Sequence, residues 1–277
     1  MSLRVKEIET PEGPARVHLS GRGPAGSLVL THGAGGGIGA SDLAALTEAL
    51  TAKGWTVALV EMPWRVAGKK VASPPARLDA AWVPLQSALT SGRWALPRPL
   101  VVGGRSAGAR VACRTCVETG ADAVLALSFP LVPPGKDASK SRIGELLVPV
   151  EAALPVAVVQ GVGDPFGSGD DVREALGDKA SRVSVTDVAG NHSPTAPVRD
   201  VVPADGDRPT GRVRVRLGLH AAPDDRDMNT GAVPGTDTCA VGLTDVVAPA
   251  RRVDQVSRVT EAMYALEPEL AESDYSS

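Results

Sequence analysis

The segment LVVGGRSAGAR at residues 100–110 constrains the fold of this 277-residue chain more than any other stretch. An apolar run leads into Gly-Arg-Ser-Ala-Gly at 104–108, and residues 109–117 have the composition of a helix. A strand, a G-x-S-x-G turn and a helix form the context in which this motif exposes a serine hydroxyl above the end of a strand. The turn is tight, so a side chain at Gly104 or Gly108 would collide with a neighbouring element. Ser106 is therefore a candidate nucleophile, and an ordinary glycine-rich turn is the alternative.

Composition and charge exclude several classes of partner. Hydrophobic residues make up 43% of the chain and charged residues 22%, which is ordinary for a globular protein. A net charge of -3 gives no electrostatic case for nucleic acid or an anionic membrane. The N-terminal residues show no apolar signal region, and no apolar run approaches the ~18 residues of a membrane span. We expect a cytoplasmic protein that needs no metal and no cofactor.

Three cysteines, an odd number, argue against a disulfide scaffold and fit a reducing compartment. Cys113 and Cys116 form a C-x-x-C pair, which in another setting would indicate redox chemistry or half of a zinc site. Both fall within the helix expected after the serine turn, and the sequence offers no second pair. Because cysteine is among the most often buried residues, we interpret them as helix packing and assign them no chemistry.

Strand and helix patterns alternate through the first two thirds of the chain. Residues 4–9 and 15–19 flank a Pro/Gly turn and predict an antiparallel hairpin. Further strands are expected at 27–31, 56–60, 100–103, 123–128, 155–160 and 183–188. Helices are expected at 41–50 with Ser41 as N-cap, and at 75–89, 109–117 and 171–176. The apolar strands lack polar alternation, as in a parallel sheet covered on both faces, so the fold class is α/β with a doubly wound, mostly parallel sheet.

The character of the sequence changes after about residue 193. Residues 194–250 show little helical period and many prolines and aspartates, which predicts an irregular segment, either loop-rich or poorly ordered. Within it, residues 212–217 alternate like an exposed strand without an evident partner. Residues 251–277 contain a helical pattern at 254–266. The expected organisation is a core over 1–193, the irregular segment, and a C-terminal helix with a tail.

An acid and a base follow the serine in chain order. A serine hydroxyl needs a base to activate it and an acid to orient that base, in the order Ser, Asp or Glu, His. Asp164 lies just past one expected strand and His192 just past the last one. Asp164 could instead be a turn former and His192 an ordinary loop residue, but both fall where the order requires. His220, in the irregular segment, is the one serious rival to His192.

Two other features have simpler explanations or alternatives. Asp170 and Asp171 open an expected helix, where capping explains them. The glycine-rich segment at 32–37 follows a strand, and its backbone N–H groups could approach a ligand closely. The N–H groups of Ala34 and Ala107 would then form an oxyanion hole. A phosphate cradle is the weaker alternative, because the segment lacks the Lys-Ser/Thr ending of a P-loop.

Taken with these motifs, the sequence resembles the α/β-hydrolase superfamily and its small, capless members related to dienelactone hydrolase. Within that branch it is similar to the group that includes testis-expressed and NSL-complex-subunit proteins. The likeness rests on LTHGAGGG (30–37), GGRSAGAR (103–110), VVQGVGDPFG (158–167) and GNHS (190–193). It implies Ser106, Asp164 and His192 as nucleophile, acid and base. The sequence departs from that group in two ways. Asn191 occupies the position before the histidine at which such proteins often carry an acidic residue. In those proteins an amphipathic helix follows soon after the histidine, whereas here no helical pattern follows it directly.

The sequence thus predicts a serine hydrolase that cleaves a carboxylic ester or thioester of a small acyl substrate. Trp64 and Phe129 could line the substrate pocket, although isolated aromatic residues more often belong to the core. The alternatives are a non-catalytic module of the same fold that binds a partner, and a nucleotide-binding protein that uses the glycine-rich segment. The sequence specifies neither the substrate nor an oligomeric state.

Overall fold

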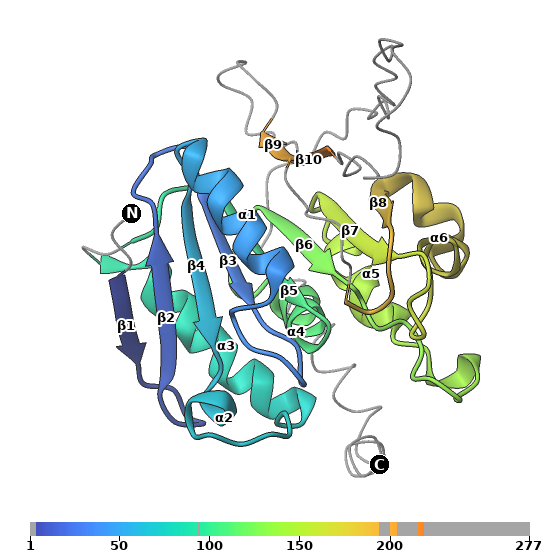
Figure 1. Ribbon diagram of the computed structural model, residues 1–277, viewed down its shortest axis with the longest axis horizontal. Coiled ribbons are helices and arrows are strands. Elements are labelled where there is room, and N and C mark those ends of the chain that lie inside the picture. The colour runs from blue at the N-terminus through green and yellow to red at the C-terminus, as the bar shows by residue number, and fades with distance from the viewer. Residues whose placement is uncertain (1–3, 93–94, 194–199, 204–214, 219–277) are drawn as a thin grey trace, which may run out of the picture.

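One mixed sheet of eight strands organises the chain (Figure 1). The computed structural model describes residues 4–92, 95–193, 200–203 and 215–218. The strand order is β1-β2-β4-β3-β5-β6-β7-β8. Their bounds are β1 Arg4–Ile8, β2 Ala15–Ser20, β3 Ser27–Thr31, β4 Thr56–Glu61, β5 Leu100–Arg105, β6 Ala123–Leu127, β7 Val156–Gly161 and β8 Val183–Val188. The expected doubly wound α/β class is therefore confirmed.

The two ends of the sheet differ in strand direction. The β1–β2 hairpin is antiparallel and joins β4 in antiparallel pairing, whereas β4, β3, β5, β6, β7 and β8 are all parallel. β3 is central, and Val29 lies between Ala58 of β4 and Val102 of β5. Every residue of β3, β6 and β7 is buried, which explains their unbroken apolar runs. Parallel strands bring their carboxyl ends to one edge, where a site can form.

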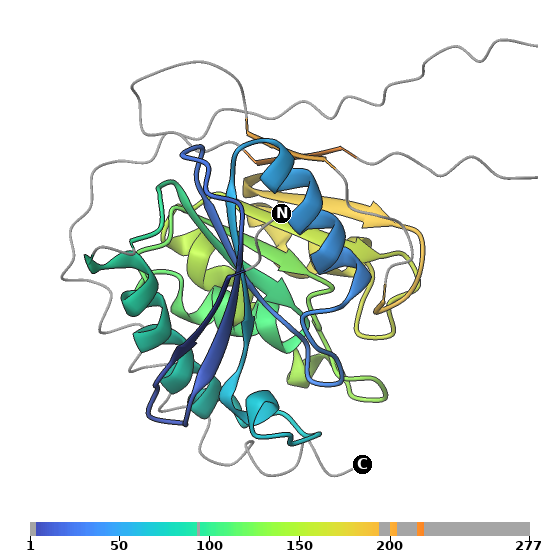
Figure 2. The same ribbon diagram turned by 60° about the vertical axis from the view of Figure 1, so that its left-hand side comes forward.

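Helices cover both faces of this sheet, as the view in Figure 2 shows. The bounds are α1 Ser41–Ala52, α2 Pro63–Val66, α3 Pro75–Thr90, α4 Ala107–Thr115, α5 Ile143–Glu151 and α6 Gly169–Leu176, with 3-10 turns η2 Ala138–Lys140 and η3 Gly177–Arg182. On one face, Leu43, Leu46 and Leu50 of α1 pack against β3 and β4. On the other face lies a larger apolar cluster to which α3, α4, α5 and α6 all contribute. The sheet is thus buried on both sides.

A buried ionic network links the three helices α3, α4 and α5 on the larger face. Arg110 Nε donates to Glu145 Oε2 at 2.8 Å, and Arg114 Nη1 lies 3.0 Å from the same oxygen. Arg114 also pairs with Asp79, at 2.6 Å between Nη2 and Oδ1. Burial alone would raise the pKa of Glu145, but the guanidinium groups of Arg114 and Arg110 outweigh it and hold the pKa at about 2. Glu145 is therefore ionised wherever the protein is folded near neutral pH.

The structure corrects some details of the elements expected from sequence. Ser41 is the first residue of α1 and not its N-cap; Ala40 holds that position, and no side chain caps the helix. Helix α5 was not expected, because Pro149 lies inside it. The short helix α2 is likewise not among the helices expected from sequence. The N-terminal hairpin and the strands β3 and β8 match their expected places.

Few of the residues beyond 193 belong to the described part of the chain. Strand β9, Asp200–Pro203, pairs antiparallel with β10, Val215–Gly218, so the alternating segment at 212–217 has a partner for its last residues. The helix expected at 254–266 lies outside the described residues, as does most of the segment at 194–250. Among the described helices, none combines the length and apolar character needed to cross a membrane.

Cys113 and Cys116 are both free thiols with fully buried side chains, Cys113 inside α4 and Cys116 at its end. Burial raises the pKa of the Cys116 thiol to about 12 and that of Cys113 well above its ordinary value. A thiol must ionise to attack or to bind a metal, so these two are inert in the folded protein. The interpretation of the C-x-x-C pair as helix packing is confirmed.

Candidate active site

Ser106 occupies the sharp turn between β5 and α4. Its backbone has φ 54° and ψ -113°, a strained conformation for a residue with a side chain, and its N–H donates to Leu127 O at 2.9 Å. Glycine is required at positions 104 and 108 because a larger residue would clash with the neighbouring backbone. A Cβ on Gly104 would lie 2.6 Å from the carbonyl carbon of Gly108, and one on Gly108 would lie 2.6 Å from Thr31 O. The turn expected from the G-x-S-x-G motif is therefore the one observed.

His192 lies in the loop that follows β8, at the same edge of the sheet as Ser106. Its Nε2 is 2.8 Å from Ser106 Oγ. The loop packs directly on the end of β7, because a Cβ on Gly161 would lie 2.2 Å from Asn191 O. Glycine at 161 thus lets the backbone before His192 approach the neighbouring strand closely.

Asp164 lies in the turn after β7, and its carboxylate faces the other ring nitrogen of His192. The distance from His192 Nδ1 to Asp164 Oδ2 is 2.8 Å, and the Asp164 side chain is fully buried. Its other oxygen, Oδ1, accepts from the N–H of Phe166 at 2.9 Å. The three side chains singled out from sequence are thus brought into one chain of hydrogen bonds. In that chain Nδ1 donates to the carboxylate, which leaves Nε2 to accept from the serine hydroxyl.

Gln160 is a site residue that sequence reasoning missed. Its side chain is fully buried in β7, and its Nε2 donates to Asp164 Oδ2 at 3.1 Å and to Gly167 O at 2.7 Å. Its Oε1 accepts from the N–H of Phe129 at 2.9 Å. The side-chain amide of Gln160 therefore binds the Asp164 carboxylate and also the backbone at Phe129 and Gly167. A polar residue in an otherwise apolar strand indicates a buried polar group, but it does not indicate which distant groups that residue binds.

Phe166 also contacts the site. Its ring centroid lies 4.4 Å from that of His192, with the planes tilted by 38°. Phe129, which the sequence offered as a pocket residue, is instead fully buried in the core. The aromatic ring beside the histidine thus comes from the turn of Asp164 and not from residue 129.

The glycine-rich segment after β3 runs beside the serine. A Cβ on Gly33 would lie 3.2 Å from Ser106 Cβ, so the chain passes the turn at van der Waals distance. Ala34 follows directly and is partly buried, and Ala107 begins α4. The N–H of Ala107 belongs to the first turn of the helix, which has no acceptor within the helix. The N–H groups of Ala34 and Ala107 therefore stay the candidates for an oxyanion hole.

His32 holds the start of this segment in place and is not a candidate base. It is buried, its Nδ1 lies 2.9 Å from Gly33 O, and its Nε2 lies 3.3 Å from the N–H of Met62. Burial lowers the pKa of His32 below its ordinary 6.5, and the nearby charge of Arg65 adds to this, so the ring is neutral. In that state Nδ1–H donates to Gly33 and Nε2 accepts from Met62.

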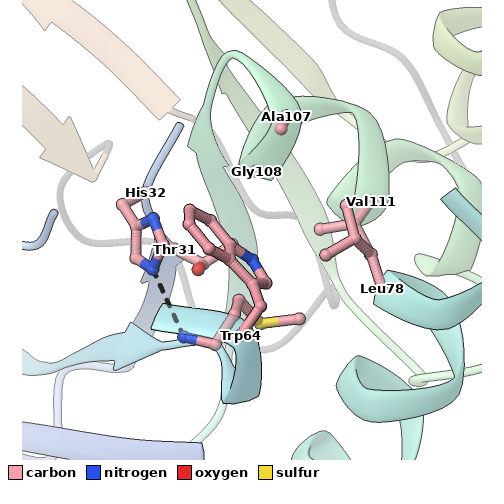
Figure 3. A pocket seen from close by; sticks show the side chains of 8 residues that line it. Thr31, His32, Trp64, Leu78, Ala107, Gly108 and Val111 are labelled. Carbon is pink, nitrogen blue, oxygen red and sulfur yellow. Dashed lines mark hydrogen bonds between the residues drawn. The ribbon is translucent and has the colours of Figure 1, made fainter. Parts of the chain in front are cut away.

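A small pocket lies next to Ala107 (Figure 3). Its enclosed space is about 10 Å³, which is room for a single water molecule. Trp64 forms one wall, with its ring edge against His32 at 5.2 Å between centroids. The lining residues are Thr31, His32, Met62, Trp64, Leu78, Ala107, Gly108 and Val111. Trp64 thus lines this pocket and also belongs to the buried apolar core, and the space is far below the roughly 300 Å³ of a typical ligand pocket.

The other histidines and the acidic pair at 170–171 are not part of this hydrogen-bond chain in the described residues. His18 lies in β2 and pairs with Glu61 at 3.0 Å. Asp171 closes a capping box with Ser168 at the start of α6, so capping accounts for it. His220 lies outside the described residues. Within the described part of the chain, no cluster of three or more His, Cys, Asp or Glu side chains is arranged to hold a metal ion.

The fold and the serine turn together define a class of protein, and a family comparison agrees with it. A family described as "Alpha/beta hydrolase domain" matches residues 24–203, about two thirds of the chain. The chain belongs to this alpha/beta hydrolase family. No curated protein matches the sequence.

Solved structures show the same fold at low sequence identity. An alpha-beta serine hydrolase homologue from Coxiella burnetii is 15% identical, with a TM-score of 0.57, over 70% of this chain and 90% of that one. Est1E from Butyrivibrio proteoclasticus is 12% identical, with a TM-score of 0.55, over 69% of this chain and 91% of that one. A serine hydrolase without lid from Xanthomonas campestris is 16% identical, with a TM-score of 0.52, over 69% and 86%.

Proposed function

We propose that the protein is a serine hydrolase that cleaves a small carboxylic ester or thioester through an acyl-enzyme at Ser106. The observation that carries the proposal is the continuous hydrogen-bond chain from Ser106 Oγ through His192 to Asp164, with both links at 2.8 Å. A base bonded to a serine hydroxyl, and a buried acid bonded to that base, are the groups that remove the hydroxyl proton when the serine acts as a nucleophile. A general hydrolase activity accords with the family.

In the acylation step, Ser106 Oγ attacks the substrate carbonyl carbon while His192 Nε2 takes the hydroxyl proton. The imidazolium that forms is stabilised by the Asp164 carboxylate, which stays ionised and holds the Nδ1–H. The tetrahedral intermediate carries a negative charge on the former carbonyl oxygen. The N–H groups of Ala34 and Ala107 are proposed to donate to that oxygen. Collapse expels the alcohol or thiol, which receives the proton from His192 Nε2.

Water then completes the cycle. His192 Nε2 takes a proton from a water molecule, whose oxygen attacks the acyl carbon on Ser106. The second tetrahedral intermediate collapses with return of the proton to Ser106 Oγ. The products are a carboxylic acid and the free enzyme, and the step consumes one water.

The pocket beside Ala107 supports a short acyl group. Its walls are mostly apolar, and its enclosed space of about 10 Å³ matches a group of the size of one methyl or one water molecule. An acyl chain whose carbonyl oxygen faces the Ala107 N–H would extend toward Trp64 and Leu78. Longer chains would have to displace buried side chains, and a packed interior resists such displacement. We therefore expect acetyl and propionyl esters to be preferred.

The test combines labelling and turnover. A fluorophosphonate probe should attach to the parent protein at Ser106, located by mass spectrometry, and not to Ser106→Ala. A panel of p-nitrophenyl esters from acetate to laurate, with matched thioesters, should show hydrolysis that declines with chain length. Absence of labelling and of hydrolysis in the folded protein would refute the proposal.

A non-catalytic binding module is the second candidate, favoured only by the sequence likeness to the group with testis-expressed and NSL-complex-subunit proteins. A module that only binds has no need of the strained turn at Ser106 or of the buried carboxylate at Asp164. The labelling experiment separates the two candidates. A nucleotide-binding role would instead appear as thermal stabilisation by added nucleotide.

A further inference from the structure

The arginine inside the G-x-S-x-G motif contacts the loop that carries the proposed base. Arg105 Nη2 donates to His192 O at 2.6 Å and to Ser193 Oγ at 2.6 Å. Arg105 directly precedes Ser106, so one side chain joins the backbone of the nucleophile to that of the base. The motif leaves this position open, and its occupant was given no role by sequence reasoning.

A buried carboxylate lies on the other side of the guanidinium. Arg105 Nε forms an ion pair with Asp42 Oδ2 at 3.2 Å, and the two side chains are only 14% and 5% exposed. Asp42 is fixed in turn, because its Oδ1 accepts from the N–H of Leu43 at 2.9 Å at the start of α1. Burying such a pair costs desolvation energy, so it is weak evidence for a purely stabilising role. Its position beside the site calls for another explanation.

The same guanidinium borders the glycine-rich segment. A Cβ on Gly36 would lie 3.9 Å from Arg105 Nη1. Arg105 therefore adjoins the serine turn, the segment of the proposed oxyanion hole, the start of α1 and the His192 loop. An arginine suits this place, because its planar fork can hold several oxygen acceptors at once and remains charged at any relevant pH.

We propose that Arg105 is a positioning residue for the proposed hydrolysis, and that Asp42 orients its guanidinium. The inference rests on the proposed function. The His192 loop leaves β8, which among the described residues pairs with β7 alone. A bond to the carbonyl of His192 itself fixes the backbone from which the imidazole projects, and so keeps Nε2 at 2.8 Å from Ser106 Oγ. A displacement of ~1 Å can cost on the order of 100-fold in rate, which gives this anchoring a large effect.

Three variants test the role. Arg105→Met keeps the stem but removes every bond of the guanidinium, Arg105→Lys keeps the charge and part of the bonding, and Asp42→Asn removes the orienting charge while preserving an acceptor for Leu43. The matched control is Arg173→Met. Arg173 likewise bonds a backbone carbonyl, Val185 O at 2.9 Å, and a carboxylate, Asp187 Oδ2 at 2.6 Å, but it contacts neither Ser106 nor the His192 loop.

We expect Arg105→Met to lower kcat on the order of 100-fold with little change in KM, because the substrate still binds while the base is misplaced. Arg105→Lys should recover part of the loss, Asp42→Asn should fall between the parent and Arg105→Met, and Arg173→Met should keep kcat within about threefold of the parent. An unchanged kcat in Arg105→Met overturns the inference. A raised KM with unchanged kcat overturns it as well, because Arg105 would then bind substrate.

A second readout does not depend on turnover. We expect the Nδ1–H of His192, bonded to Asp164, to give a downfield proton signal in NMR spectra of the parent and of Arg173→Met, and to be identified by its loss in His192→Ala. We expect this signal to weaken or disappear in Arg105→Met, and its full retention would count against the positioning role. Ser106→Ala is assayed in parallel. If Ser106→Ala hydrolyses as well as the parent, the proposed function fails, and the proton signal still decides the role of Arg105.

Discussion

His192 Nε2 and Ser106 Oγ lie 2.8 Å apart although 86 positions separate the two residues in the chain. Strand order explains this proximity, since β5 and β8 are parallel members of one sheet and both residues follow the carboxyl end of their strand. The first two predictions address this contact, one from each side.

Ser106→Ala should abolish hydrolysis and leave the fold intact. The hydroxyl projects from a turn whose shape depends on Gly104 and Gly108, so its removal leaves the apolar clusters untouched. Loss of a serine nucleophile costs on the order of 10⁶ in kcat in well-studied triads. Steady-state rates on the preferred ester, with circular dichroism to verify folding, provide the measurement. A variant that retains activity within a few fold of the parent would move the nucleophile elsewhere.

His192→Ala should lose nearly all activity, whereas His220→Ala should retain most of it. The prediction rests on the two bonds of His192, to Ser106 and to Asp164. His220 lies outside the described residues, and the sequence around it has no pattern that would predict a core of its own. Both variants are compared in the same ester assay. The reverse pattern would assign the base to His220.

Gly104→Ala and Gly108→Ala should each destabilise the protein by about 3 kcal/mol or more, because the new Cβ would lie 2.6 Å from backbone atoms that cannot move aside. Gly144→Ala is the matched control. It lies in α5, and a Cβ there would meet no atom within 4 Å, so its effect should be within about 1 kcal/mol and stabilising. Urea unfolding measures all three. Equal stability of the three variants would contradict the packing of the serine turn.

Glu145→Gln should reduce stability by about 3 to 5 kcal/mol at neutral pH, since it leaves Arg110 and Arg114 buried beside a neutral group. The pKa of Glu145 is about 2 in the folded protein against an ordinary 4.5. The stabilisation from its charge is therefore complete above pH 4.5 and declines as pH falls toward 2. The free energy of unfolding, measured for both proteins along this range, should converge at low pH. A constant difference would show that Glu145 does not titrate in this way.

Much of the sheet could be predicted from sequence because its signals are local. Apolar runs such as β3 and β6 have the length and composition of buried strands, and turn residues delimit them. The order of Ser106, Asp164 and His192 along the chain likewise needs no knowledge of distant contacts. Helix α5 lacked such a signal, because Pro149 interrupts its pattern.

The supporting residues of the site could not be predicted, because their roles depend on neighbours far away in sequence. Gln160 bonds Phe129 across 31 positions, and Arg105 bonds His192 across 87. Each resembles an ordinary polar residue at the end of a strand until the sheet brings the loops together. Asp42 similarly lies in the first turn of a helix, where a negative charge is favourable and needs no further explanation.

The position of β8 at the edge of the sheet determines where the protein would begin to lose activity on warming. Among the described residues this strand has hydrogen bonds to β7 on one side only, so it can open locally at a smaller free-energy cost than the central strands. Such opening would carry His192 away from Ser106 while the interior stays packed. The upper temperature for turnover would then be set by the weakest-held strand, and amide hydrogen exchange in residues 183–188 would report it before any probe of Trp82 in the core.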